Sequence, residues 1–252
     1  ASDVYKRQDQ LRIAYQNRPN LFDRKITLTD PLYDEIIEVE ERVTSSGKIL
    51  KPINKESLIN DLRKIKNVKK KSCAIVFMHS CKFNKHEKEA EKVAKISGFS
   101  HISLSYRTSQ IMKFVMRGDT TVADAYLSPV LNKYIENLYS EFEEDISSKM
   151  SFMQSNGGLT DANLFQGKDA LLSGPAGGVV SMTQTGKQAG FNKLIGFDMG
   201  GTSTDVCHFA GEFERSFETE LAGVRIRAPM MQINTVAAGG GSILSYKDGR
   251  FQ

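Results

Sequence analysis

The sequence has little of what marks secreted, membrane-embedded or nucleic-acid-binding proteins. Its 252 residues include only three cysteines and no Cys-x-x-Cys pair, so we expect reduced thiols and a cytoplasmic location. No apolar run approaches the roughly 18 residues of a membrane helix, and no apolar signal-peptide core is present, so no membrane segment is expected. The net charge is only +4, which is too small to predict a nucleic-acid partner.

The composition is that of a globular protein. Hydrophobic residues make up 40% and charged residues 25% of the chain, enough to bury a core without disulfides or metals. There is no internal repeat. The chain begins at Ala1, not at Met, and stops at Gln252, in a predicted strand just after an Asp248-Gly249 turn. We therefore expect an internal fragment of a longer protein, in which residues 1–8 have no assigned place.

A strand–helix–strand pattern is predicted between residues 54 and 104. Asn54 is suited to cap a helix that has Leu58, Ile59, Leu62 and Ile65 on one face. The apolar run 73–78 predicts a buried strand, residues 85–97 a helix that ends at Gly98, and residues 101–104 a second strand. Short connections of this kind predict a βαβ unit with a parallel sheet.

A long helix is predicted next, from Thr120 to about residue 146, with Pro129 inside it as a kink or the start of a new segment. We place a domain boundary just before it, near Arg117 and Gly118, which divides the chain into domains 1–117 and 118–252. After a strand at 150–154 and a glycine turn, Ser173-Gly174-Pro175 opens a further helix that ends at Gly190.

The last sixty or so residues read as β-hairpins with glycine turns. An apolar strand at 194–198 delivers Asp198 to Gly200, Gly201 and Thr202, and a strand resumes at 206–209. Glycines allow positive φ and let backbone N–H groups converge on an anion, so such a turn can cradle phosphates. Thr202 and Thr204 then offer hydroxyl donors to phosphate oxygens, and Asp198 and Asp205 are suited to hold Mg²⁺ through its waters. The alternative is a tight hairpin whose Asp and Thr side chains cap their own backbone.

The flanking residues resemble the second phosphate loop of the actin-like ATPase superfamily. There, two such hairpins grip the phosphates of ATP from opposite sides of a cleft. The resemblance implies an incomplete actin-like (ribonuclease H-like) α/β fold, with a partner hairpin upstream of Ala1.

A longer series of motifs resembles the hydantoinase A and 5-oxoprolinase family, from about Leu11 to Gln252. Within the family, residues 115–121 and 210–214 resemble the 5-oxoprolinase branch more than hydantoin hydrolases or acetone carboxylase subunits. The blocks occur in the family's order at residues 16–23, 31–33, 39–43, 124–129, 154–158, 172–180, 197–206 and 234–242.

The resemblance implies ATP-dependent hydrolysis of 5-oxo-L-proline to L-glutamate, with the lactam oxygen phosphorylated first. It also implies a hydantoinase B-type module, fused or separate, that completes ring opening, and an oligomeric parent protein. Alternatives are a hydantoin hydrolase, an acetone carboxylase-type subunit, or a nucleotide-binding module without chemistry.

Roles for particular residues follow from the same resemblance. It implies phosphate contact by Gly200, Gly201 and Thr202, a water-mediated Mg²⁺ at Asp198, and support of the loop or metal by Thr204 and Asp205. Two points stay open. The run Gly239, Gly240 and Gly241 either approaches the nucleotide or lets two strands cross closely. Residues 173–178 either present a helix N-terminus to an anion or pack tightly against the hairpin.

Other chemistry finds less support. His79, Cys81 and His86, with Cys73 nearby, match no structural zinc spacing. His79 and Ser80 follow a strand and are candidates to face a cleft. Because Gly-x-Ser-x-Gly is missing, no Ser-His-Asp nucleophile is predicted.

Overall fold

The computed structural model describes residues 22, 24–25, 30–65, 71–143, 149–221 and 223–251. It separates into two compact units. No helix in these ranges is both long enough and apolar enough to cross a bilayer. Unit 1 comprises Ala1–Ser148, Gln166–Lys168 and Glu218–Ala228, and unit 2 comprises Lys149–Phe165, Asp169–Phe217 and Pro229–Gln252.

The division differs from the boundary expected near Arg117 and Gly118. Helix α5 (Phe114–Glu141) runs through that position without a break, and unit 1 continues to Ser148. The helix starts six residues earlier than the expected Thr120, and it continues through Pro129 instead of restarting there. Residues 1–8 and most of the 16–23 block lie outside the described residues.

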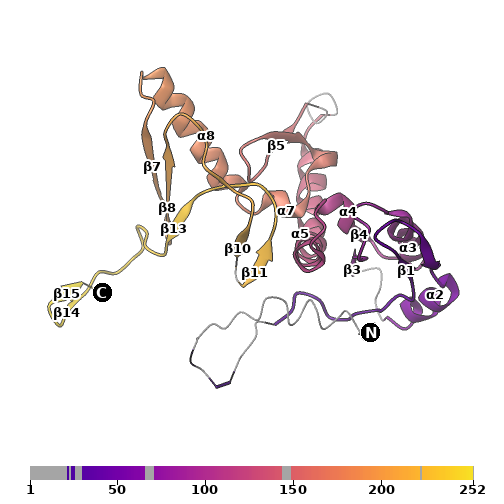
Figure 1. Cartoon of the computed structure of the whole chain (residues 1–252). Coiled ribbons are helices and arrows are strands. Elements are labelled where there is room, and N and C mark those ends of the chain that lie inside the picture. The colour runs from indigo at the N-terminus through magenta and orange to yellow at the C-terminus, as the bar shows by residue number, and fades with distance from the viewer. Residues whose placement is uncertain are drawn as a thin grey trace. The chain divides into compact units, whose positions relative to one another are not determined.

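Unit 1 contains the predicted βαβ unit (Figure 1). Strands β3 (Ser72–Ile75) and β4 (His101–Leu104) pair in parallel, with Ser72 opposite His101 and Ile75 opposite Leu104, and α3 (Lys85–Ile96) connects them. Gly98 adopts a φ of +96°, which ends α3 as expected. Helix α2 (Lys55–Arg63) starts at Asn54, whose side chain accepts a hydrogen bond from the N–H of Ser57 at 3.1 Å.

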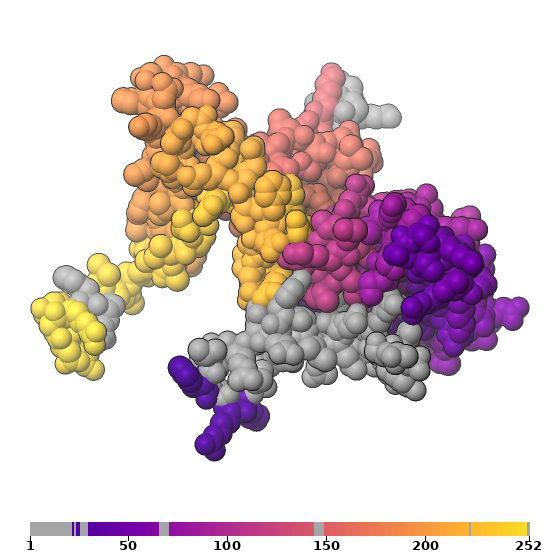
Figure 2. Space-filling model, viewed as in Figure 1, coloured from indigo at the N-terminus to yellow at the C-terminus, as the bar shows by residue number. Residues whose placement is uncertain are grey.

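The core of unit 1 lies between α2, α3 and the two parallel strands. Leu58 and Leu62 from α2 meet Ala90 and Val93 from α3 and Ile75 from β3, all of them buried. Each buried aliphatic side chain of this size contributes about 1.5–3 kcal/mol relative to an exposed one. In the space-filling view the purple part of the chain, which contains these elements, forms one closely packed body (Figure 2).

Strand β3 ends at Ile75, three residues before the predicted end at Met78. The backbone N–H of Phe77 donates to the Glu87 carboxylate at 3.0 Å, and the carbonyls of Phe77 and Met78 accept from the Arg117 guanidinium. Side chains thus form hydrogen bonds with the backbone groups that a longer pair of strands would have used. The other elements of unit 1 are β1 (Arg42–Val43), β2 (Ile49–Lys51), α4 (Ser105–Thr108), β10 (Thr219–Leu221) and β11 (Val224–Ile226), and α7 (Gly167–Ala170) begins there.

Unit 2 is built on an antiparallel hairpin and one long helix (Figure 1). Strands β7 (Leu194–Met199) and β8 (Thr204–Phe209) pair along their full length, and β13 (Asn234–Val236) pairs with β8 to give the order β13-β8-β7. Helix α8 (Ser173–Gln188) ends before Gly190, whose φ of +89° confirms the predicted stop.

Smaller elements complete unit 2. Gly157 (φ +82°) turns the β5–β6 hairpin, and Asp248 and Gly249 (φ +54° and +79°) turn the last one, as the sequence predicts. These elements are β5 (Ser151–Met153), β6 (Leu159–Asp161), η2 (Ala162–Leu164), β9 (Arg215–Ser216), β12 (Met230–Met231), β14 (Tyr246–Lys247) and β15 (Arg250–Phe251).

Candidate functional site

The turn between β7 and β8 is a tight, exposed tip. Met199 lies opposite Thr204, and the N–H of Gly200 donates to the carbonyl of Ser203 at 2.9 Å, which leaves Gly201 and Thr202 at the end of the hairpin. Both are exposed. Strand β8 begins at Thr204, two residues earlier than predicted. The tip therefore presents backbone and a hydroxyl group on a rigid two-stranded support.

Two carboxylates face each other just below this tip. Asp198 and Asp205 are direct cross-strand partners, so their side chains lie on the same face of the hairpin. The hydroxyl of Thr235, which is opposite Asp205 on β13, donates to the Asp205 carboxylate at 2.6 Å. Like charges directly opposite each other destabilise a ladder, and a cation between them relieves that repulsion. Mg²⁺ commonly uses one or two carboxylates, waters and substrate phosphates, which fits this pair.

Helix α8 packs closely on the hairpin through its glycines. A Cβ on Gly186 would lie 2.5 Å from the Leu194 side chain, and one on Gly178 would lie 4.0 Å from an Asp198 oxygen. Gly196 on β7 is similarly tight, because its Cβ would lie 2.4 Å from the Cys207 sulfur. Within residues 173–178, Ala176 is fully buried in a cluster against which Cys207 of β8 packs, so close packing of a helix on the hairpin is the interpretation that this position favours.

The glycine run (Gly239, Gly240 and Gly241) crosses the backbone of the hairpin tip. The N–H groups of Gly240 and Gly241 donate to the carbonyls of Gly200 and Gly201 at 2.9 and 2.8 Å. A Cβ on Gly239 would lie 2.7 Å from backbone atoms of both Gly200 and Gly201. Close approach thus requires glycine at Gly239 and leaves little room at Gly241, where a Cβ would lie 3.0 Å from the Gly201 carbonyl oxygen. Gly200 and Gly201 do not adopt the positive φ expected from the sequence.

Thr204 is turned away from the tip. It is only 3% exposed, and its hydroxyl donates to the carbonyl of Ala238 at 2.6 Å, at the start of the glycine run. This geometry fits support of the loop better than contact with a phosphate. Thr235 and Ala238 belong to the same arrangement, but no local sequence signal indicates their contacts, because they lie about thirty residues from the partners that they meet.

The face of β7 opposite α8 is apolar and open in the described part of the chain. Ile195, Phe197 and Met199 alternate along β7 and are 76%, 68% and 55% exposed. Exposed apolar side chains that share a sheet face mark a surface on which another segment packs.

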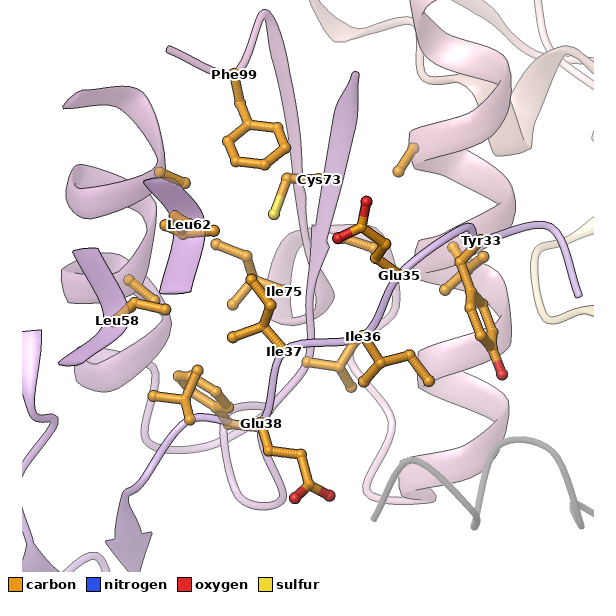
Figure 3. Close-up of a pocket in the computed structure, with 18 of the residues that line it drawn as sticks. Tyr33, Glu35, Ile36, Ile37, Glu38, Leu58, Leu62, Cys73, Ile75 and Phe99 are labelled. Carbon is orange, nitrogen blue, oxygen red and sulfur yellow. The ribbon is translucent and has the colours of Figure 1, made fainter. Parts of the chain in front are cut away.

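Unit 1 contains a separate cavity of about 830 Å³ (Figure 3). The segment that contains Ile36 and Ile37 covers it, and Figure 3 shows Ile37 near Leu58 and Ile75, while the Glu38 carboxylate points away. Lys71, which also lines it, is paired with Asp34 and Glu35 at 3.3 and 3.2 Å. Much of the remaining lining is aliphatic, and several acidic residues, among them Glu38 and Glu41, also lie along it, which does not suit a phosphate group.

Cys73 also lines the cavity, and burial raises the pKa of its thiol to about 11. The thiol is therefore protonated at neutral pH and a poor nucleophile or metal ligand. Within the described ranges no group of three or more His, Cys, Asp or Glu side chains is placed to hold a metal ion. His86 instead pairs with Glu41 at 2.6 Å, with both side chains buried.

Of the two candidate residues that follow β3, His79 is partly exposed and Ser80 is buried. Ser80 is 2% exposed and donates to the carbonyl of Phe77 at 2.8 Å. It also lies 3.0 Å from the Ser105 hydroxyl. Ser105 in turn donates to Glu87 and accepts from Arg117, and both of these charged side chains have no exposed surface. Ser80 thus belongs to a buried network, and the expectation that it faces a cleft is wrong.

Comparison with known proteins identifies the class first. The crystal structure of ATP-dependent caprolactamase from Pseudomonas jessenii superposes with a TM-score of 0.76 and 25% identity, over 97% of this chain and 37% of that one. The fold is an α/β fold of the actin-like ATPase class.

The family follows from the sequence itself. Residues 117–252 match the model for hydantoinase/oxoprolinase, and residues 5–98 match the model for the hydantoinase/oxoprolinase N-terminal region. The chain belongs to the hydantoinase/oxoprolinase family. It is 42% identical to 5-oxoprolinase 1 of Arabidopsis thaliana and 41% identical to 5-oxoprolinase of Saccharomyces cerevisiae, in each case over 97% of this chain. It spans about a fifth (21%) of the length of these relatives.

Proposed function

We propose that the chain forms part of the ATP-binding module of an ATP-dependent 5-oxoprolinase, in which the β7–β8 tip holds the phosphates of ATP. The observation that carries the proposal is the tip itself. Gly201 and Thr202 are exposed there, and none of the described residues accepts a hydrogen bond from their N–H groups. No atom of the described residues lies within 4 Å of the position of a Cβ on Gly201, apart from its chain neighbours, so a phosphate oxygen has room to approach its backbone.

Each predicted residue has a place in this proposal. The backbone at Gly200, Gly201 and Thr202 and the Thr202 hydroxyl contact phosphate oxygens, and Asp198 and Asp205 hold Mg²⁺ directly or through water. Bound Mg²⁺ neutralises charge on the phosphates. Thr204, Gly239, Gly240 and Gly241 support the tip.

The proposed reaction explains why ATP is needed. An unstrained lactam is a poor electrophile. In the proposed reaction, the lactam oxygen of 5-oxo-L-proline attacks the γ-phosphorus and ADP leaves. One water then adds at the activated carbon and the ring C–N bond breaks as the nitrogen takes up a proton, which gives the acyl phosphate γ-glutamyl phosphate. A second water hydrolyses this acyl phosphate to L-glutamate and phosphate. Phosphoryl transfer depends mainly on positioning and charge neutralisation, which a glycine tip and a Mg²⁺ ion held by the carboxylate pair would supply.

The rest of the machinery belongs to a longer protein in this proposal. A second phosphate hairpin and a hydantoinase B-type module, fused or separate, complete the reaction, and the parent protein is an oligomer. The open apolar face of β7 is a suitable surface for the remainder of the ATPase module. Three free thiols support a cytoplasmic location.

The test uses a coupled assay of ADP release with 5-oxo-L-proline. In the complete polypeptide that contains this chain, Thr202→Ala and Asp198→Ala should each abolish ATP turnover while the circular dichroism spectrum stays unchanged. Unchanged turnover in both variants would contradict the proposal. The 252-residue chain alone should show no turnover, and clear substrate-dependent ADP release from it would refute the need for a second phosphate hairpin.

A further inference from the structure

We infer that Thr204 and the glycine run are positioning elements, which aim two backbone N–H groups of the hairpin tip outward in the same direction and do not themselves contact the nucleotide. This inference rests on the proposed function, because the two N–H groups are those of Gly201 and Thr202. The inference gives the glycine run a role in orienting the hairpin tip, which the presence of three glycines does not by itself indicate.

The direction of the two N–H groups follows from the geometry of the peptide bond. In a trans peptide group the C=O of one residue and the N–H of the next point in opposite directions, and no cis bond is present among the described residues. The Gly200 carbonyl points at the N–H of Gly240, and the Gly201 carbonyl points at the N–H of Gly241. The N–H groups of Gly201 and Thr202 must therefore both point away from the glycine run.

Two successive N–H groups on one side of a turn form a small anion-binding concavity. In isolation the peptide groups of such a tip rotate readily, because glycine has few steric limits. The pair of hydrogen bonds from the glycine run removes that freedom before a ligand arrives. Preorganised donors lose less entropy on binding and stabilise developing charge better than mobile ones.

Thr204 holds the glycine run in place. Its backbone pairs with Val236 on β13, and its buried hydroxyl donates to the carbonyl of Ala238 at 2.6 Å. The run then closes on itself, since the N–H of Gly239 donates to the Ser242 hydroxyl at 3.0 Å and the N–H of Ser242 donates to the Gly239 carbonyl at 2.9 Å. Thr204 thus acts on the tip through the glycine run.

The glycines of the run provide an internal scale for the test. A Cβ on Gly239 would meet hairpin backbone at 2.7 Å, one on Gly241 at 3.0 Å, and one on Gly240 at an ordinary 3.7 Å. Substitution by alanine should therefore disturb the hairpin tip most at Gly239, less at Gly241 and least at Gly240. The two hydrogen bonds from Gly240 and Gly241 to the hairpin tip are called the clamp. A Cβ on Gly201 meets no atom of the described residues within 4 Å, so Gly201→Ala leaves the clamp intact and obstructs only the approach of a phosphate.

The experiment measures KM for ATP and kcat in the complete polypeptide, together with the thermal unfolding midpoint. Gly239→Ala should raise KM for ATP at least tenfold, Gly241→Ala less, and Gly240→Ala least. Thr204→Val should also raise KM for ATP severalfold. Thr204→Ser, which keeps the hydroxyl donor, should have a KM close to that of the unaltered protein. Thr183→Val is the matched control, because Thr183 is equally buried and its hydroxyl has no partner among the described residues.

The outcomes separate this inference from the proposed function. If Gly201→Ala weakens ATP binding while Gly239→Ala and Thr204→Val leave KM unchanged, the clamp is wrong and the phosphate site stands. If Gly201→Ala also leaves KM unchanged, the phosphate site is wrong and the clamp falls with it. If Thr204→Ser raises KM for ATP as much as Thr204→Val does, the hydroxyl does not position the glycine run, and the assignment of Thr204 is overturned.

Discussion

The Arg117 network in unit 1 and the β7–β8 tip in unit 2 use polar groups in opposite ways. In the network, Arg117 donates to Ser105 and to the carbonyls of Phe77, Met78 and Ile111, so the polar groups of a fully buried side chain are turned inward and paired. At the tip, exposed backbone groups are held in place by other backbone groups and face outward.

The difference separates a structural device from a binding device. A buried charge must be paired to be tolerated, and once it is paired nothing is left to bind a ligand. An exposed N–H group costs little because water satisfies it, and it becomes valuable when a fixed anion replaces the water. Changes in the network should therefore lower stability, whereas changes at the tip should lower nucleotide binding.

The largest effect is expected for Arg117→Met. Removal of the guanidinium leaves the Ser105 hydroxyl and several carbonyls buried without their donor, and it removes the positive charge that attracts the buried Glu87 carboxylate, which should lower the free energy of unfolding by about 3–5 kcal/mol. Urea unfolding of the chain measures it. Thr202→Ala at the tip should change the same quantity by less than about 0.5 kcal/mol. Equal losses in both variants would remove the contrast between the two regions.

A smaller effect is expected where α8 packs on the hairpin. Gly186→Ala places a Cβ 2.5 Å from the Leu194 side chain and should destabilise unit 2 by about 1–3 kcal/mol. The higher helix propensity of alanine offsets part of this loss. Gly174→Ala, in the same helix and with no atom within 4 Å of the added carbon, should instead stabilise by about 0.5–1 kcal/mol. Thermal unfolding of both variants gives the comparison, and the same sign for both would contradict the packing account.

Asp119 offers a test through pH. Burial raises the pKa of its carboxyl from 3.8 to about 6, against the opposing attraction of Arg225. In the unfolded chain the group ionises near its ordinary value, so raising the pH from about 4 to about 6 favours the unfolded state. Stability from this group is therefore highest below pH 3.8 and is lost by about pH 6. Asp119→Asn should lose that pH dependence, and an unfolding profile parallel to that of the unaltered chain would show that Asp119 does not titrate in this range.

The smallest effect is expected for Thr183→Val. Thr183 is fully buried in α8, and its hydroxyl has no hydrogen-bond partner among the described residues. Replacing an unpaired hydroxyl by a methyl group of similar size should leave stability unchanged or raise it by up to about 1 kcal/mol. A clear loss of stability in chemical denaturation would show that the hydroxyl makes a contact that the structure does not include.

Local signals predicted the local parts of the fold. The Asn54 cap, the Gly98 and Gly190 helix ends and the hairpin at Asp248-Gly249 each depend on residues adjacent in sequence, and the structure confirms them. The start of α5 was missed because Lys113 makes no side-chain cap and Gly118 is a weak helix former. The buried contacts of the Arg117 side chain with distant backbone hold that first turn in place.

The candidate site was predictable in composition but not in arrangement. The Asp198-to-Asp205 motif predicted the hairpin and assigned both carboxylates to Mg²⁺. Their direct opposition was not predicted, because the second strand was expected to begin at 206 and it begins at Thr204. The glycine run left two interpretations open, since only tertiary packing brings Gly240 and Gly241 onto the carbonyls of Gly200 and Gly201. Thr204 looked like a ligand because a hydroxyl beside a glycine loop suits phosphate, and only the structure places that hydroxyl on Ala238.

The most direct test of the central claim is a structure of the complete polypeptide with Mg²⁺ and a non-hydrolysable ATP analogue. The account predicts phosphate oxygens within about 2.7–3.2 Å of the backbone nitrogens of Gly201 and Thr202. It also predicts Mg²⁺ beside Asp198 and the glycine run behind the tip, out of contact with the nucleotide. A nucleotide bound elsewhere, with the tip covered by protein, would contradict it.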